Sequence, residues 1–204
     1  MEYNERNKDM LIFVGLGNPD PDLEGTRHNI GRDVLKAFAK AQGFSEWQEK
    51  GKFNAEVSEG KVGKEKITLV LPTVYMNQSG GTVQKFITSA KKAESLVLVH
   101  DDLDRALGKI NLNYNKNSGG HKGVESVIKK IKTKNFGRLR LGISKATPKG
   151  VVRKPKGEEA VTKYVLGKWS KGEEKELKKS LKTAVEALEI IAKEGRMLAM
   201  NKVN

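Results

Sequence analysis

The sequence predicts a single α/β domain. Short apolar runs of strand length alternate with longer stretches whose apolar residues recur at helical spacing, a pattern typical of α/β proteins. With 204 residues, the chain is long enough to bury a substantial core as one domain. Neither an internal repeat nor a linker-like stretch divides it.

The first half opens with the apolar run Leu11–Gly15, which predicts a short strand near the centre of a sheet. A helix follows and ends at Gly43, where a glycine can cap it; its apolar stripe is Ile30, Val34, Leu35, Phe38 and Ala41. We expect two paired strands at Phe53–Ser58 and Lys66–Leu71. After Pro72, a loop leads to a helix with the apolar face Val83, Phe86, Ile87 and Ala90.

The second half continues the alternation, with strands expected at Ser95–His100, Gly108–Tyr114 and Arg138–Ile143. In the last of these, residues 139, 141 and 143 are apolar and share one side, whereas Arg138 and Arg140 share the other. One helix before this strand carries Val124, Val127, Ile128 and Ile131. A long closing helix before Gly195 carries Leu177, Leu181, Val185, Leu188 and Ile191.

Two segments differ from this regular pattern. Residues 1–10 form a polar N-terminal extension, so the domain spans residues 11–204. Within the domain we expect a mobile basic loop at about residues 145–158, because Ala146–Glu159 contains two prolines, two glycines and four basic residues.

The charge of +14 is concentrated in the second half. Residues 1–102 hold 14 basic and 15 acidic residues, whereas residues 103–204 hold 25 and 10. Residues 116–156 alone contain 13 basic residues and a single acid, Glu125. A lysine-rich solvated surface is one explanation, but a concentration this one-sided favours a polyanionic partner, most often a nucleic acid.

The chain has no cysteine, which excludes disulfides, thiol nucleophiles and thiolate zinc sites. It has neither a secretory signal pattern nor an apolar run of membrane-spanning length. We therefore expect a soluble, cytoplasmic protein with no membrane partner.

Residues 14–29, Val-Gly-Leu-Gly-Asn-Pro-Asp-Pro-Asp-Leu-Glu-Gly-Thr-Arg-His-Asn, leave the first strand and place Asn18 and His28 ahead of a helix. Loops on a rigid scaffold often hold binding and catalytic groups, and His28 can take a proton from water at neutral pH. A capping histidine is the alternative. A dinucleotide fingerprint fails, because Asp20 occupies its third glycine position.

A second cluster, Val99-His-Asp-Asp-Leu-Asp104, ends the Ser95–His100 strand. One of its carboxylates could orient His28 and stabilise the imidazolium form. A metal site is the rival hypothesis. Strand alternation sends His100 and Asp101 to opposite faces, which disfavours it. We interpret His100 as structural.

Two further segments could bind substrate. In Pro72-Thr-Val-Tyr-Met-Asn-Gln-Ser-Gly80, the Asn77 amide could donate to a carbonyl oxygen or an oxyanion, although Asn77 and Ser79 could simply cap the next helix. Ser118-Gly-Gly-His-Lys-Gly123 opens a lysine-flanked helix whose backbone N–H groups would suit a phosphate, or it is an ordinary glycine-rich cap.

Taken together, these segments resemble the bacterial-type peptidyl-tRNA hydrolase family from about Leu11 to the C-terminus. Each motif alone has low specificity, whereas all of them in this order are highly specific. The matching stretches are Gly-Leu-Gly-Asn-Pro with Thr-Arg-His-Asn, Pro-Thr-Val-Tyr-Met-Asn-Gln-Ser-Gly, Val-His-Asp-Asp-Leu-Asp, Gly-Gly-His-Lys-Gly, Phe-Gly-Arg-Leu-Arg-Leu-Gly-Ile and Tyr-Val-Leu-Gly-Lys.

The resemblance implies a twisted mixed β-sheet with helices on both faces, and hydrolysis of the ester between a peptide and the 3′ ribose of tRNA. Three residues take the implied catalytic roles: His28 as the base that activates water, Asp101 as its supporting carboxylate and Asn18 as the contact to the peptide. No metal or cofactor is implied. The implied substrate-binding residues are Asn77, Met76, Tyr75, His121, and the departures Leu23 and Lys122.

The departures concern the substrate side. Leu23 replaces a usual tyrosine, Lys122 a usual asparagine and Asp20 a usual glycine. Strand lysines found in the family appear here as Asn111 and Asn113. The resemblance implies that Arg138 and Arg140 lie near the acceptor stem of the tRNA. The loop after Ser144 is longer and more basic than is usual in the family, and we expect it to grip the acceptor stem and compensate for the missing strand lysines; its basic residues are Lys145, Lys149, Arg153, Lys154 and Lys156.

The expected partner is therefore peptidyl-tRNA, bound by a monomer. The main alternative is a non-catalytic RNA-binding protein on the same fold, as in relatives that assist splicing. A nucleotide-dependent enzyme is a third, disfavoured by the broken glycine fingerprint.

Overall fold

A mixed β-sheet forms the centre of the molecule. The structure, a computed structural model, describes residues 10–204, so the predicted polar extension lies outside the described residues except for Met10. Seven strands run in the order β2-β3-β4-β1-β5-β7-β6, and β8 pairs with β7. The strands are β1 (Leu11–Gly15), β2 (Gln48–Lys50), β3 (Ala55–Val62), β4 (Glu65–Pro72), β5 (Leu96–Ala106), β6 (Ile110–Tyr114), β7 (Gly137–Ala146) and β8 (Val152–Arg153).

The four central strands, β4, β1, β5 and β7, are parallel to one another. The remaining pairs, β2 with β3, β3 with β4, β6 with β7 and β7 with β8, are antiparallel. The expected mixed sheet is thus confirmed, with the predicted first strand at its centre. Because the central strands are parallel, their carboxyl ends meet at one edge of the sheet.

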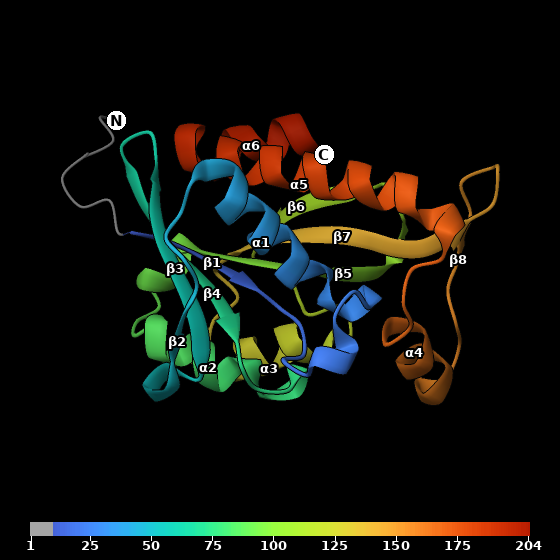
Figure 1. The fold of residues 1–204 in the computed structure, drawn as a ribbon, viewed down its shortest axis with the longest axis horizontal. Coiled ribbons are helices and arrows are strands. Elements are labelled where there is room, and N and C mark those ends of the chain that lie inside the picture. Colours follow the sequence, from blue (N-terminus) through green and yellow to red (C-terminus); the bar gives the residue numbers. More distant parts are fainter. Residues whose placement is uncertain (1–9) are drawn as a thin grey trace.

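Helices cover both faces of the sheet (Figure 1). On one face lie α1 (Ile30–Gln42), α5 (Glu174–Glu194) and α6 (Arg196–Val203), and on the other lie α2 (Ser79–Phe86) and α3 (Lys122–Ile131). The short helix α4 (Glu158–Val165) stands at the end of the sheet, beyond the carboxyl end of β5. No helix among residues 10–204 combines the length and apolarity needed to cross a bilayer.

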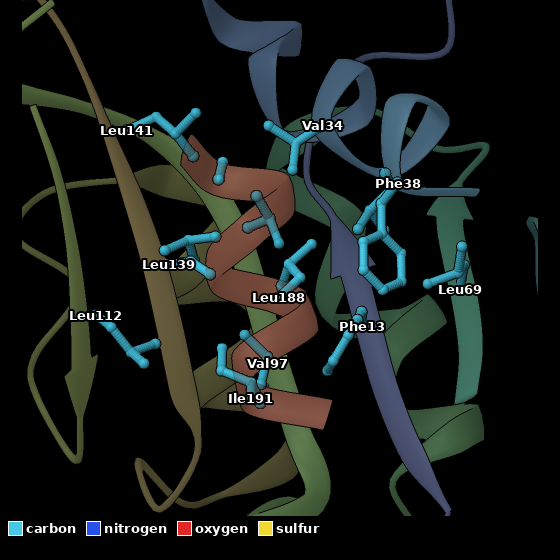
Figure 2. Packing of buried hydrophobic residues seen from close by; sticks show 14 of the residues in the cluster. Phe13, Val34, Phe38, Leu69, Val97, Leu112, Leu139, Leu141, Leu188 and Ile191 are labelled. Carbon is cyan, nitrogen blue, oxygen red and sulfur yellow. The ribbon is translucent and has the colours of Figure 1, made fainter. Parts of the chain in front are cut away.

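Strand alternation divides the core into two clusters. In β1, Phe13 packs toward α1 and α5, whereas Ile12 and Val14 pack toward α2 and α3. Figure 2 shows the first cluster, in which Phe13, Phe38 and Leu188 meet between the sheet and its helices. The predicted side of β7 that carries Leu139, Leu141 and Ile143 belongs to this cluster.

The structure differs from the predicted elements in several places. Strand β2 was not predicted, because its residues are polar and fully on the surface. The expected basic loop is wrong in extent: Lys145 and Ala146 belong to β7, pair with Arg153 and Val152 of β8, and form a hairpin. Glu158 already begins α4.

Candidate functional site

A cavity of about 550 Å³ opens at the carboxyl ends of the central strands, the usual place for a ligand in such a sheet. It brings together all four of the predicted segments, represented by Asn18, Asn77, Asp101 and His121. Its remaining wall contains Lys154 and Pro155 and the α4 residues Val161, Thr162 and Val165.

Glycines allow the segment that carries His28 to lie against β5. A Cβ added to Gly31, in the first turn of α1, would lie 2.2 Å from the Val99 carbonyl oxygen, and one on Gly15 would lie 2.5 Å from the Gly31 oxygen. Only glycine permits this approach. The first turn of α1 and the first half of β5 are therefore adjacent, although Gly31 and Val99 lie 68 positions apart in the chain.

His28 and Asp101 form the predicted pair: Nδ1 of His28 lies 2.8 Å from Oδ1 of Asp101. The Asp101 side chain is buried and that of His28 is 15 % exposed. Burial opposes protonation of His28, but the charge and hydrogen bond of Asp101 outweigh it and raise the pKa of His28 above 6.5. In turn, His28 and His121 overcome the effect of burial and hold the pKa of Asp101 well below its usual range.

His121 is the second partner of Asp101. Its Nδ1 accepts hydrogen bonds from the backbone N–H groups of Gly123 and Val124, at 3.1 and 3.3 Å, and so caps α3. The proton of this ring therefore lies on Nε2, which donates to Asp101 Oδ1 at 2.9 Å. Since two N–H groups of the helix end are already paired, the hypothesis that this end binds a phosphate loses support.

The positions of the ring protons also determine whether His28, Asp101 and His121 could bind a metal ion. Among the described residues, His28, Asp101 and His121 have ligand atoms within 4.8 Å of one another, which is close enough for one metal ion to contact all three. However, the nitrogens of both rings that face Asp101 carry protons, and a metal on His121 would require the cap on α3 to break. These residues fit a hydrogen-bonded catalytic group better than a metal centre. The rival metal set on residues 100–104 is not assembled, because Asp102 pairs with Arg140 instead.

Asn18 is held in one orientation. Its Oδ1 accepts from the Met76 backbone N–H at 2.9 Å, and its backbone is bound on both sides by the Asn29 amide, at 2.8 and 3.0 Å. With the oxygen occupied, the Nδ2 group is the donor left for a ligand in the cavity. Asn29 thus positions Asn18, a role that the sequence did not indicate.

The other predicted substrate residues separate into two groups. Tyr75, Met76 and Asn77 line the cavity, with Met76 buried and the other two exposed. Leu23 does not: it belongs to the turn Pro21–Leu23, and its carbonyl oxygen accepts from Thr26. The structure therefore does not support the expectation that Leu23 contacts substrate in this cavity.

The two arginines of β7 also differ. Arg140 reaches the cavity, where it binds buried Asp102 at 2.8 Å and Asn113 at 3.4 Å. Arg138 is only 2 % exposed and is absent from the cavity lining, so the structure does not support its predicted contact with tRNA. The basic residues of the β7–β8 hairpin and of the segment that follows it, together called the basic hairpin below, are exposed, and they are Lys145, Lys149, Arg153, Lys154 and Lys156.

The buried arginine Arg27 holds in place the segment that carries His28. Arg27 binds both carboxylate oxygens of Glu173 at 3.0 and 2.9 Å and the carbonyls of Gly167 and Lys168. Its guanidinium lies over the rings of Tyr164 and Trp169. Arg27 directly precedes His28, so these contacts tie the segment that carries His28 to the residues after α4. Sequence spacing did not reveal this link.

Comparison with known proteins agrees with this geometry. The family model described as peptidyl-tRNA hydrolase matches residues 12–204. The chain belongs to this family. Among its relatives, the peptidyl-tRNA hydrolase of Nostoc sp. is 41 % identical over 196 residues, covering 95 % of this chain and 94 % of that protein. That of Aquifex aeolicus is 40 % identical over 184 residues, covering 88 % of each.

Solved structures of the peptidyl-tRNA hydrolase family share the fold. The crystal structure of peptidyl-tRNA hydrolase from Acinetobacter baumannii superposes with a TM-score of 0.84 at 30 % sequence identity, covering 96 % of this chain and 94 % of that one. The resemblance predicted from the motifs is confirmed at the level of family and fold.

Proposed function

We propose that this chain hydrolyses the ester bond between a peptide and the 3′ ribose of tRNA. The observation that carries the proposal is the His28–Asp101 pair in the cavity, with Nδ1 of His28 bound to the carboxylate at 2.8 Å. This bond directs the proton to Nδ1 and leaves the lone pair on Nε2, which can take a proton from an attacking water. The resulting hydroxide adds to the ester carbonyl and forms a tetrahedral intermediate. As this intermediate collapses, the bond between the carbonyl carbon and the ribose oxygen breaks, and His28 Nε2 returns its proton to that oxygen.

The peptide side is assigned to Asn18, Asn77 and the residues beside them. The free Nδ2 of Asn18 supports a hydrogen bond to a peptide carbonyl. Exposed Asn77 supports a second donor, to the carbonyl oxygen or the oxyanion that it becomes. Tyr75, Met76 and His121 complete this wall of the cavity. The mechanism employs side chains alone and needs no metal or cofactor.

The tRNA side is assigned to Arg140, which lines the cavity, and to the basic hairpin. The net charge of +14 supports attraction of the polyanionic substrate. We further propose that the chain acts as a monomer, since one copy of the chain supplies every residue of the assigned site. We propose the cytoplasm as the place where it acts.

The alternative, a non-catalytic RNA-binding protein, is not favoured. It rested on changes at Leu23 and Lys122, but Leu23 lies outside the cavity lining. A protein that only bound RNA would have no need of a histidine oriented by a buried carboxylate.

The test compares the wild type with His28→Ala. The wild type should release free tRNA from peptidyl-tRNA, whereas His28→Ala should lose this activity and still bind tRNA in a filter-binding assay. A wild-type protein that leaves peptidyl-tRNA uncut would refute the proposed function. A His28→Ala variant with undiminished turnover would refute the role of His28.

A further inference from the structure

Two ion pairs bridge the mouth of the cavity. On one side, Lys122 Nζ lies 2.7 Å from Glu158 Oε1, which joins the first residue of α3 to the first residue of α4. On the other, Lys154 pairs with Asp104 at the end of β5. Lys122 itself lines the cavity. The segment from residue 154 to residue 158 is thus tied to the rest of the cavity rim through opposite charges.

The Lys122–Glu158 pair is exposed and therefore easily exchanged. The two side chains are 64 % and 81 % exposed, and exposed pairs of this kind contribute little to stability. Arg140 differs, because its partner Asp102 is only 6 % exposed. Lys122 can thus give up its carboxylate for another anion without leaving a buried charge unpaired, as can Lys154, whose pair with Asp104 is 54 % and 51 % exposed.

Lys122 is also close enough to the catalytic group to act on it. It directly follows His121, and its charge opposes protonation of His28. In the proposed substrate, the phosphodiester of the 3′-terminal nucleotide belongs to the same nucleotide as the ester that His28 attacks. Because Lys122 and His28 line the same cavity, Lys122 is well placed for that phosphate, to which a lysine ammonium binds as a point charge.

We propose that Glu158 masks Lys122 in the free protein, and that the 3′-terminal phosphodiester of the tRNA displaces Glu158 from Lys122. This inference rests on the proposed function. Glu158 acts as an internal competitor for the phosphate, so it weakens binding of RNA. Once released, its carboxylate remains in the first turn of α4, where the helix dipole favours a negative charge.

The chain provides a matched control for this proposal. Glu159 is exposed, follows Glu158 in α4 and forms no ion pair with the other described residues. Glu158→Gln and Glu159→Gln therefore change the net charge equally, but only the first releases Lys122.

The experiment measures KM for peptidyl-tRNA in low salt. Glu158→Gln should lower KM by about two- to fivefold, the range that an exposed pair supports, and Glu159→Gln should change it by a smaller factor. Lys122→Gln should raise KM, and in that background Glu158→Gln should have no effect beyond that of Glu159→Gln. Equal shifts for the two glutamate variants, or an effect of Glu158→Gln that persists without Lys122, would overturn the proposal.

A binding measurement separates this inference from the proposed function. A fluorescent RNA tetranucleotide that ends in CCA is titrated with the same variants, which needs no turnover. Tighter binding by Glu158→Gln than by Glu159→Gln supports the masking even if the wild type does not cleave peptidyl-tRNA. Identical affinities refute the masking even if the wild type does.

Discussion

The hydrogen bond between His28 and Asp101 joins residues that lie 73 positions apart in the chain. It fixes which ring nitrogen carries the proton, and hence where a water can be deprotonated. His121 donates to the same carboxylate oxygen and keeps its own proton on Nε2 because α3 occupies its Nδ1. Asp101 thus receives two N–H donors, which explains how a carboxylate remains ionised in a buried position.

The pH dependence of activity tests this pair. His28 must be neutral to accept a proton, and its pKa lies above 6.5 because Asp101 favours the charged form. The wild-type kcat/KM should therefore fall as the pH is lowered, with a midpoint above 6.5. In Asp101→Asn the charge is gone and burial lowers the pKa of His28, so the midpoint should move to lower pH while kcat at neutral pH drops by about 100-fold or more. A midpoint that moves upward, measured over pH 5 to 9, would contradict this assignment.

Individual site residues were predictable where a motif carried them. Asn18, His28 and Asp101 followed from the loop after the first strand and from the end of the Ser95–His100 strand, and the structure brings all three to one cavity. The roles of Asn29 and Arg27 were missed, because they depend on contacts between residues that are distant in sequence. Asn29 positions Asn18, whose side chain binds Met76, and Arg27 binds Glu173. For Arg138 and Arg140, alternation gave the common face but not which of them reaches the cavity.

The N-terminus of α3 is the element on which the site depends most. His121 caps it through Gly123 and Val124, the second and third helical residues, where a capping side chain normally accepts. Asparagine is among the best capping residues, whereas alanine cannot cap. Substitutions at this position can therefore separate the helix cap from the contact with Asp101.

We expect His121→Ala to lower the free energy of unfolding by about 1 kcal/mol, and His121→Asn to retain most of it. Both variants remove a donor from Asp101, which then stabilises the protonated form of His28 more strongly. The acid midpoint of kcat/KM should therefore rise in both. Urea unfolding and a pH profile measure the two effects, and a loss of stability as large in His121→Asn as in His121→Ala would contradict the capping role.

The packing of α2 against α3 offers a second test at the level of elements. A Cβ on Gly80 would lie 2.1 Å from the Ser126 carbonyl oxygen, whereas the neighbouring Gly81 faces open space. We expect Gly80→Ala to destabilise the protein by about 1–3 kcal/mol. Gly81→Ala should be neutral or stabilise it by up to about 1 kcal/mol. Thermal unfolding measures the stability of the two variants. A similar change in stability for both would show that α2 and α3 are not in close contact at Gly80.

At the level of elements, hydrophobic periodicity predicted the strands and helices that face the core, because burial determines which of their positions are apolar. The strands and helices that face the core carry clear apolar patterns, and all of those predicted are present. Strands β2 and β8 have two or three mostly exposed residues each, so pairing with a neighbouring strand defines them and no local pattern marks them. Helix α2 ends at Phe86, before the predicted Ile87 and Ala90, because an apolar residue can pack against the core without being helical.

The molecule as a whole is strongly basic, and the basic hairpin extends beside the cavity that holds His28. If the hairpin contacts tRNA, neutralising Lys145, Lys149, Arg153, Lys154 and Lys156 should raise KM for peptidyl-tRNA. It should also flatten the dependence of log(kcat/KM) on log salt by about 0.7–0.9 per lost phosphate contact.

A control variant with the same change in charge neutralises exposed lysines outside the cavity lining, which are Lys171, Lys175, Lys178, Lys179 and Lys182. It should leave the salt slope closer to that of the wild type. An unchanged slope in the hairpin variant, or equal slopes in the two variants, would contradict a specific role of the hairpin.

The fold class and the family could be predicted from the order of motifs along the whole chain, and the topology explains why that order matters. The parallel strands β4, β1 and β5 end at the same edge, so the segments that follow them converge there. The bridges across the cavity mouth could not be predicted, because Lys122 and Glu158 are 36 positions apart in the chain and only the tertiary structure brings the first residues of α3 and α4 within reach of each other.

The central claim is that His28 activates water for attack on the ester of peptidyl-tRNA. Its most direct test is single-turnover hydrolysis of matched N-blocked and free aminoacyl-tRNA by the wild type and by His28→Ala. The wild type should cleave the N-blocked substrate much faster than the free one, and His28→Ala should cleave neither. Intact N-blocked substrate with the wild type, or cleavage by His28→Ala at the wild-type rate, would contradict the account.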